Sequence, residues 1–180
     1  QTDRCADRQA GIDDLVDDLA PDVVVVAHSP GYRSGLVPAD DGATGDDLWR
    51  AGLAGLASDL EERAIGLLVV LATPRFDDDP LDCAVAAGAT EPCDLDADRV
   101  RAALEPWHEV ERRALAEVGH GVTYDPTGRL CEAGRCPLAV DGLVRYSDLH
   151  HLTTAASETF GPDLARALER AAFRPGGRGP

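Results

Sequence analysis

The chain of 180 residues contains no lysine, no asparagine and no methionine, so all 17 of its basic residues are arginines. They stand against 33 acidic residues, and the formal net charge is −16. An acidic surface repels the phosphates of nucleic acids and of anionic lipid headgroups, so nucleic acid is not expected as a partner. We attribute the amino-acid bias to the source genome rather than to function.

Long hydrophobic runs are also missing. No apolar stretch approaches the ~20 residues that a membrane-spanning helix needs. The chain begins with Gln1 rather than methionine and carries no signal peptide. We therefore expect it to be a piece of a longer precursor.

Recognisable metal-binding patterns are absent as well. The cysteines do not have the C-x-x-C spacing of zinc and redox sites. The acidic run at 77–79 lacks both the spacing and the glycine of a calcium loop, and a solvated loop explains it better. Neither a metal ion nor a cofactor is therefore expected.

Four of the five cysteines fall in two close pairs, Cys83 with Cys93 and Cys131 with Cys136. Two local disulfides are the simplest interpretation and indicate an oxidising compartment, with buried free thiols as the alternative. Cys5 is then left over near the N-terminus. An odd cysteine there suggests that its partner lies upstream.

Apolar periodicity predicts helices alternating with buried strands. Helices are expected over 7–19, 46–64, 96–118 and 153–172, strands over 22–27, 66–72 and 121–125, and a hairpin over 138–146. The β-branched run at 22–27 is typical of a strand buried on both faces of a parallel sheet. We expect one three-layer α/β/α domain with a parallel sheet over residues 1–173, and a disordered tail over 174–180.

In such sheets ligands bind beyond the carboxyl ends of the strands, where the loops 28–34, 73–95 and 146–153 are expected to meet. The last loop contains Asp148 and His151, residue types that suit an acid orienting an imidazole base. The alternative is that Asp148 merely caps the final helix and His151 packs beside it.

Three residues after the first strand are candidates for substrate binding: His28, Ser29 and Tyr32. His28 either helps to polarise an oxyanion or only fills the loop. For Ser29 a loop-capping hydroxyl is favoured over a nucleophile. His108 and His120 are expected to be structural or exposed.

With these elements in order, the chain resembles the SGNH hydrolase-like domain fused to the C-terminus of acyltransferase 3 family membrane proteins. The resemblance covers nearly all of the chain, and the motif at 146–153 is its most specific feature. The other carrying features are Cys5 before a helix, the strand 23–26, and the segments 48–50, 72–76, 80–83 and 131–137.

The resemblance implies that Asp148 and His151, not His150, supply the acid and base of a Ser-His-Asp triad. The sequence also departs from the family's pattern in two places. It contains neither the Gly-Asp-Ser nucleophile motif nor the asparagine that lines the SGNH oxyanion hole. We therefore expect the C-terminal two-thirds of the domain, with a sheet incomplete at its N-terminal strands and no activity on its own. The first strand should then lie beside an unpaired edge.

By the same resemblance, the intact protein is expected to be an O-acyltransferase that moves acetyl groups onto cell-surface or secreted glycans. An upstream membrane domain would supply the acyl group and tether the SGNH domain to the extracytoplasmic face of the membrane. The catalytic serine would lie outside the given sequence. The alternatives are an SGNH-type esterase and a non-catalytic module that binds glycan or has a structural role.

Overall fold

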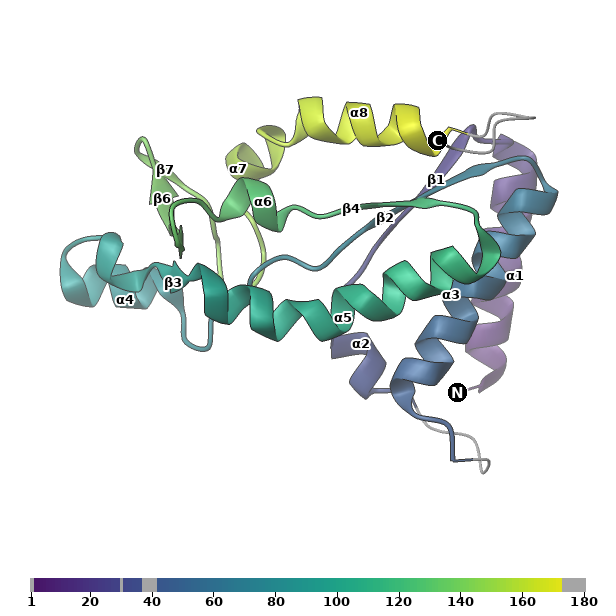
Figure 1. Cartoon of the computed structure of the whole chain (residues 1–180), viewed down its shortest axis with the longest axis horizontal. Coiled ribbons are helices and arrows are strands. Elements are labelled where there is room, and N and C mark those ends of the chain that lie inside the picture. The colour runs from purple at the N-terminus through teal and green to yellow at the C-terminus, as the bar shows by residue number, and fades with distance from the viewer. Residues whose placement is uncertain (1, 30, 37–41, 173–180) are drawn as a thin grey trace.

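The computed structural model describes residues 2–29, 31–36 and 42–172 (Figure 1). The helices are α1 (Thr2–Leu19), α2 (Gly31–Ser34), α3 (Gly45–Glu62), α4 (Pro80–Ala87), α5 (Ala97–Val118), α6 (Thr127–Leu130), α7 (Thr154–Glu158) and α8 (Gly161–Ala171), with a 3₁₀ turn over Glu91–Cys93. The strands are β1 (Val23–Ala27), β2 (Gly66–Val70), β3 (Leu95–Asp96), β4 (Val122–Tyr124), β5 (Arg135–Cys136), β6 (Ala139–Val140) and β7 (Leu143–Val144). In these ranges no helix combines the length and apolarity that crossing a membrane requires.

The central element is a parallel sheet in the order β1-β2-β4. β2 lies in the middle, and Leu67, Leu68 and Val69 have no exposed surface. A central strand of a parallel sheet is covered on both faces, which explains why its apolar run has no polar alternation. The predicted α/β fold with a parallel sheet is confirmed.

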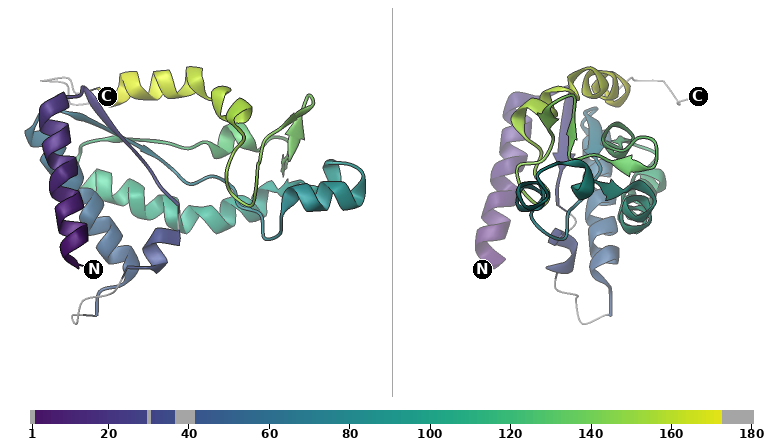
Figure 2. Two further views of the ribbon diagram at one scale, coloured as in Figure 1. Left: turned by 180° about the vertical axis from the view of Figure 1, so that it is seen from behind. Right: turned by 90° about the vertical axis from the view of Figure 1, so that its left-hand side faces the viewer.

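Helices cover both faces of the sheet. Leu67 and Val69 pack in one core cluster with residues of α3 and α5. Leu68 points to the opposite face and packs against Ala167 and Ala171 of α8. Figure 2 shows the same arrangement, with α8 on one side of the sheet and α3 and α5 on the other.

β1 is an edge strand, which among the described strands pairs with β2 alone. Val24 and Val26 pack against the α3–α5 cluster, whereas Val25 is 49% exposed. The prediction that 22–27 is buried on both faces is therefore wrong, because α8 lies over β2 and β4 and leaves Val25 uncovered. The expected unpaired edge is present, and α1 has exposed apolar side chains at Ile12, Leu15 and Leu19.

The expected last helix over 153–172 is in fact two helices, α7 and α8. Gly161 and Pro162 begin the second helix. Proline has no N–H to donate into a preceding turn and is tolerated in the first turn of a helix, so it starts a new helix rather than continuing the old one.

The loop expected over 73–95 contains α4. Asp79 caps it by accepting a hydrogen bond from the Leu81 N–H at 2.8 Å, and Pro80 opens its first turn. Gly88 ends it with a positive φ of 68°. The third aspartate of the acidic run therefore has a local structural role as a helix cap.

The two predicted disulfides are present. Cys83–Cys93 ties α4 to the 3₁₀ turn, and Cys131–Cys136 closes the turn between α6 and β5. The predicted hairpin is also present as β6 and β7, with positive φ at both Asp141 and Gly142 as a primed turn requires. The side chain of Cys5 and the tail at 174–180 lie outside the described residues, and the expectations about them stay untested.

We predict that Gly66→Ala destabilises the protein by about 1–3 kcal/mol. Gly66 begins β2, and a Cβ atom there would clash with the carbonyl oxygen of Ala171 at the end of α8. Backbone atoms of α8 and β2 would have to separate. Urea unfolding followed by circular dichroism measures the change.

Gly55→Ala is the matched control, because a Cβ at this position on α3 meets nothing within 4 Å. Replacing an unstrained helical glycine by alanine should stabilise the fold by ~0.5–1 kcal/mol. Equal destabilisation by both substitutions would contradict the proposed close approach of α8 to β2.

Candidate active site

The segment 145–153 forms a loop that closes on itself at its base. Tyr146 and Leu152 form an antiparallel bridge, and the Thr153 N–H donates to the Arg145 carbonyl at 2.9 Å. The side chain of Thr153 caps α7 by accepting from the Ala156 N–H at 3.2 Å. Thr153 caps α7 and Phe160 stands at the N-cap of α8, so the alternative that Asp148 caps the final helix is wrong.

Segment 72–76, which follows β2, holds this loop from a distant part of the chain. The Phe76 N–H donates to the Leu149 carbonyl at 2.8 Å, and the Phe76 ring meets Tyr146 edge to face. The Thr73 hydroxyl reaches the His150 carbonyl at 3.5 Å. Two of the three predicted loops, 73–95 and 146–153, therefore meet beyond the carboxyl end of β2.

His108 supports the same segment from α5. Its Nε2 lies 3.1 Å from the Ala72 carbonyl, and its Nδ1 lies 3.6 Å from a carboxylate oxygen of Asp125, which follows β4. The residue is 2% exposed. Of the two predicted possibilities for His108, structural or exposed, the structural one is correct.

The pair at the tip of the loop has the geometry expected for an acid that orients an imidazole. His151 Nδ1 lies 2.6 Å from Asp148 Oδ2. With the ring proton on Nδ1, this nitrogen donates to the carboxylate and Nε2 keeps its lone pair. The His151 side chain is 67% exposed, so the ring is open to solvent and to a substrate.

His150 does not occupy this position, although it is the neighbouring residue. Its Nδ1 lies 3.7 Å from Asp148 Oδ1, beyond hydrogen-bond distance. The Asp148 carboxylate instead accepts the backbone N–H groups of His150 at 2.9 Å and His151 at 2.8 Å through Oδ1.

These hydrogen bonds explain the electrostatics of Asp148. The backbone N–H of His150, the His151 side chain and the backbone N–H of His151, in that order of size, hold the pKa of Asp148 well below its usual range. Hydrogen bonds to a carboxylate favour its charged form. The acid is therefore ionised at neutral pH and available to stabilise an imidazolium.

The third predicted loop, 28–34, turns toward the helices. His28 Nε2 lies 2.6 Å from Glu111 Oε1 of α5, both side chains are buried, and the His28 ring lies 4.4 Å from that of Trp49 on α3. Ser29 Oγ accepts from the Gly31 N–H at 3.4 Å, as a loop-capping hydroxyl does. Tyr32 is exposed. Substrate binding by these three residues stays a prediction.

Sequence reasoning missed the buried Glu111 and Arg33. The Arg33 guanidinium lies 3.7 Å from the centre of the Trp107 ring and donates to the Trp107 carbonyl. Burial lowers the pKa of Arg33, while nearby Asp46 and Glu111 act in the opposite direction. Glu111 lies at helical spacing from the apolar residues on the buried face of α5. A charged residue at such a position was the signal in the sequence that was overlooked.

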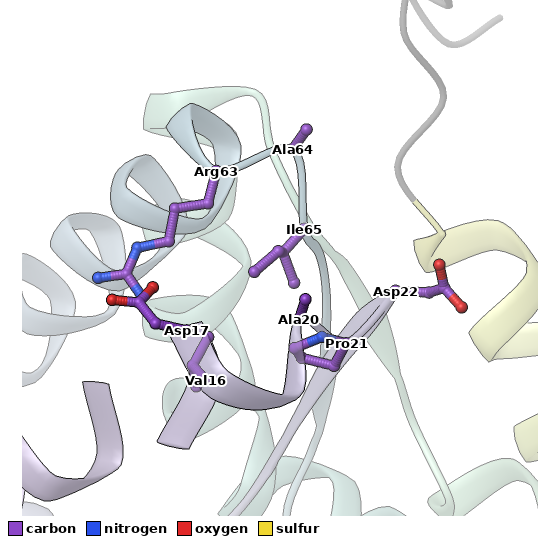
Figure 3. Close-up of a pocket in the computed structure, with 8 residues that line it drawn as sticks. All are labelled: Val16, Asp17, Ala20, Pro21, Asp22, Arg63, Ala64 and Ile65. Atoms are coloured by element: carbon purple, nitrogen blue, oxygen red, sulfur yellow. The ribbon is translucent and has the colours of Figure 1, made fainter. Parts of the chain in front are cut away.

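A cavity of about 290 Å³ lies at the other end of the sheet, where α1 ends and β1 and β2 begin (Figure 3). Arg63 and Asp17 both line the cavity and form an ion pair, with 3.1 Å between a guanidinium nitrogen and a carboxylate oxygen. Ligands of parallel sheets bind at the carboxyl ends of the strands, so this cavity is not the expected site of chemistry.

Comparison with known proteins agrees with this architecture. The sequence profile of the SGNH domain that is fused to AT3 domains matches residues 1–166. No curated protein matches. The fold is similar to that of the periplasmic domain of a lipopolysaccharide acetyltransferase from Salmonella ser. Paratyphi A, with a TM-score of 0.58 and 16% sequence identity.

The similar region covers 83% of this chain and 59% of the Salmonella domain, so the chain spans well under two-thirds of that domain's length. At such low identity the likeness establishes the fold alone. The profile match over residues 1–166 includes the sheet, both disulfides and the Asp148–His151 loop. The chain belongs to the family of SGNH domains that are fused to AT3 domains.

Proposed function

We propose that this domain is the extracytoplasmic part of an O-acyltransferase that acts on cell-surface or secreted glycans. The observation that carries the proposal is the 2.6 Å hydrogen bond between Asp148 and His151 on a solvent-exposed loop. Membership of a family fused to AT3 domains supports a membrane acyltransferase as the source of the acyl group. The two disulfides and the fold shared with a periplasmic domain support the extracytoplasmic location.

In the proposed reaction, a serine outside the given sequence attacks the carbonyl carbon of the acyl donor. His151 Nε2 accepts the serine proton, and Asp148 stabilises the resulting imidazolium through Nδ1–H. The imidazolium then protonates the leaving group of the donor. In the second step His151 takes a proton from a glycan hydroxyl, whose oxygen attacks the acyl-serine and releases the serine with the proton returned by His151.

An esterase would use the same residues, with water in place of the glycan hydroxyl. A non-catalytic glycan-binding module is the second candidate function. It is favoured by the absence from the sequence of both a Gly-Asp-Ser motif and any asparagine. The ordered Asp148–His151 hydrogen bond favours the enzyme, because a binding module has no need of an oriented base.

The test is made in cells that produce the full-length protein, with Asp148 and His151 both replaced by alanine. We expect normal protein levels and loss of base-labile acyl groups from the surface glycan, measured as released acetate. Unchanged acylation by the double variant would rule out the catalytic role and support the binding module. Loss of acyl groups from wild-type cells, relative to cells that lack the protein, would instead identify an esterase.

A further inference from the structure

We propose that Asp148, His150 and His151 form a binding site for Zn²⁺, and that zinc occupancy switches off the general base. Each of the three side chains offers a ligand atom, and these atoms lie within 4.8 Å of one another. Imidazole nitrogen and carboxylate oxygen are ligands that zinc takes in proteins. The sequence did not reveal this site, because a D-x-H-H spacing is not a recognised zinc pattern.

The two distances between ligand atoms lie on either side of the spacing found around a coordinated zinc ion. His151 Nδ1 is 2.6 Å from one carboxylate oxygen of Asp148, and His150 Nδ1 is 3.7 Å from the other. Ligand atoms around a tetrahedral zinc are separated by roughly 3.3 Å, given bonds of about 2.0–2.1 Å. To form the site, His151 Nδ1 must therefore move slightly away from Asp148 and His150 Nδ1 slightly toward it, and zinc must replace the proton of the His151–Asp148 hydrogen bond.

The surroundings of His150 point the same way. Its Nδ1 is buried without a hydrogen-bond partner, while its ring lies 4.0 Å from that of His151. A buried polar atom without a partner is unfavourable, and coordination of a metal ion would satisfy it. The Asp148 carboxylate is held in place by two backbone N–H groups, so little ordering of this ligand is required.

The surroundings also favour a cation. The chain has a net charge of −16, which raises the local concentration of metal ions. The side chain of His151 is 67% exposed and that of His150 is 39% exposed, so an ion can enter from solvent. Three protein ligands leave the fourth position of a tetrahedral zinc for water.

Zinc at His151 Nδ1 changes the chemistry of the ring. A neutral imidazole carries one proton, so a metal ion on Nδ1 requires that proton on Nε2. Nε2 then has no lone pair with which to accept a proton. This consequence rests on the proposed function, because it matters only if His151 is the general base; the binding of zinc does not depend on it.

Binding is tested by titrating the purified chain with ZnCl₂ in a calorimeter, alongside NMR of the histidine ring nitrogens. We expect a single tight zinc ion per chain, with shifts confined to His150 and His151 and the ring proton of His151 moved to Nε2. His150→Gln should weaken binding by at least about tenfold, the smaller end of what loss of a supporting group causes. If zinc shifts the NMR signals of other histidines of the wild-type chain instead, the proposed site is wrong.

Asp78→Asn is the matched control, since Asp78 is an exposed acid in the run at 77–79. It should leave zinc affinity unchanged. Equal affinity of the wild type and His150→Gln would overturn the proposal. If His150→Gln fails to fold, the confinement of wild-type shifts to His150 and His151 still decides the outcome.

Inhibition is tested separately in the full-length protein, as the ratio of acyl-transfer rates with and without zinc. The ratio should fall for the wild type and stay near one for His150→Gln. Equal inhibition of both proteins would refute the switch. Failure of the proposed function gives a different result. Zinc would still bind to the wild-type chain, but the double variant Asp148→Ala, His151→Ala would keep its activity.

Discussion

Replacing His151 by alanine in the full-length protein is expected to lower the rate of acyl transfer by about 10²–10⁴-fold, the usual contribution of a general base. The reason lies in the loop geometry. Asp148 Oδ2 lies 2.6 Å from Nδ1 of the exposed His151 ring, which leaves Nε2 as the proton acceptor, so removing the ring removes the acceptor. The decrease should appear in kcat, because the imidazole assists the transition state rather than ground-state binding.

Asp148→Asn tests the orienting role of the acid. The amide can donate a hydrogen bond to Nδ1, which favours the tautomer with the proton on Nε2 and blocks the base. We expect a kcat far below that of the wild type, with KM nearly unchanged. Initial rates of acetyl transfer to purified glycan measure both constants.

Asp78→Asn again provides the control, because it makes the same chemical change in the exposed run 77–79. It should retain the wild-type rate. A full rate for Asp148→Asn, or a rise in KM without a fall in kcat, would show that the pair binds substrate rather than transferring a proton.

Glu111→Ala should destabilise the fold by about 1–3 kcal/mol, as expected when a buried polar group loses its hydrogen-bond partner. Glu111 is 1% exposed, and its carboxylate lies 2.6 Å from His28 Nε2. Without it, His28 would be left buried against Trp49 with both ring nitrogens unsatisfied. The buried Arg33 would also lose a favourable charge nearby.

Glu117→Ala on the same helix is the control. Glu117 pairs with Arg50 at 2.7 Å, but both side chains are well exposed, and a surface pair contributes only about 0–1 kcal/mol. Urea unfolding of the two variants gives the comparison. Similar losses of unfolding free energy in both variants would mean that the contact between His28 and Glu111 does not stabilise the fold.

Local patterns in the sequence were sufficient for much of the fold. The apolar run of β2 predicted a buried strand, and Asp141-Gly142 predicted the turn of the hairpin. The two disulfides join cysteines close in sequence, so spacing alone identified them. In each case the interacting groups are near neighbours in the chain, and residue type alone limits their geometry.

The Asp148–His151 pair was predictable for the same reason. The two residues are three positions apart, and the loop needs only one turn to bring the acid to the ring. Sequence could not show what holds that loop. The hydrogen bond from Phe76 to Leu149 and the contact of His108 with Ala72 join segments distant in the chain, which only the folded sheet brings together.

Tertiary structure also decided which polar residues are buried. His28 was a candidate for substrate binding, and nothing in the sequence indicated that its Nε2 contacts Glu111 of α5 or that its ring lies against Trp49 of α3. The long run at 22–27 was predicted to be fully buried, but its position at the sheet edge leaves Val25 exposed. A sequence specifies which segments form strands and helices through short-range sterics and hydrophobic periodicity. Strand order, helix coverage and buried polar contacts depend on the packing of distant segments, so only the tertiary structure determined them.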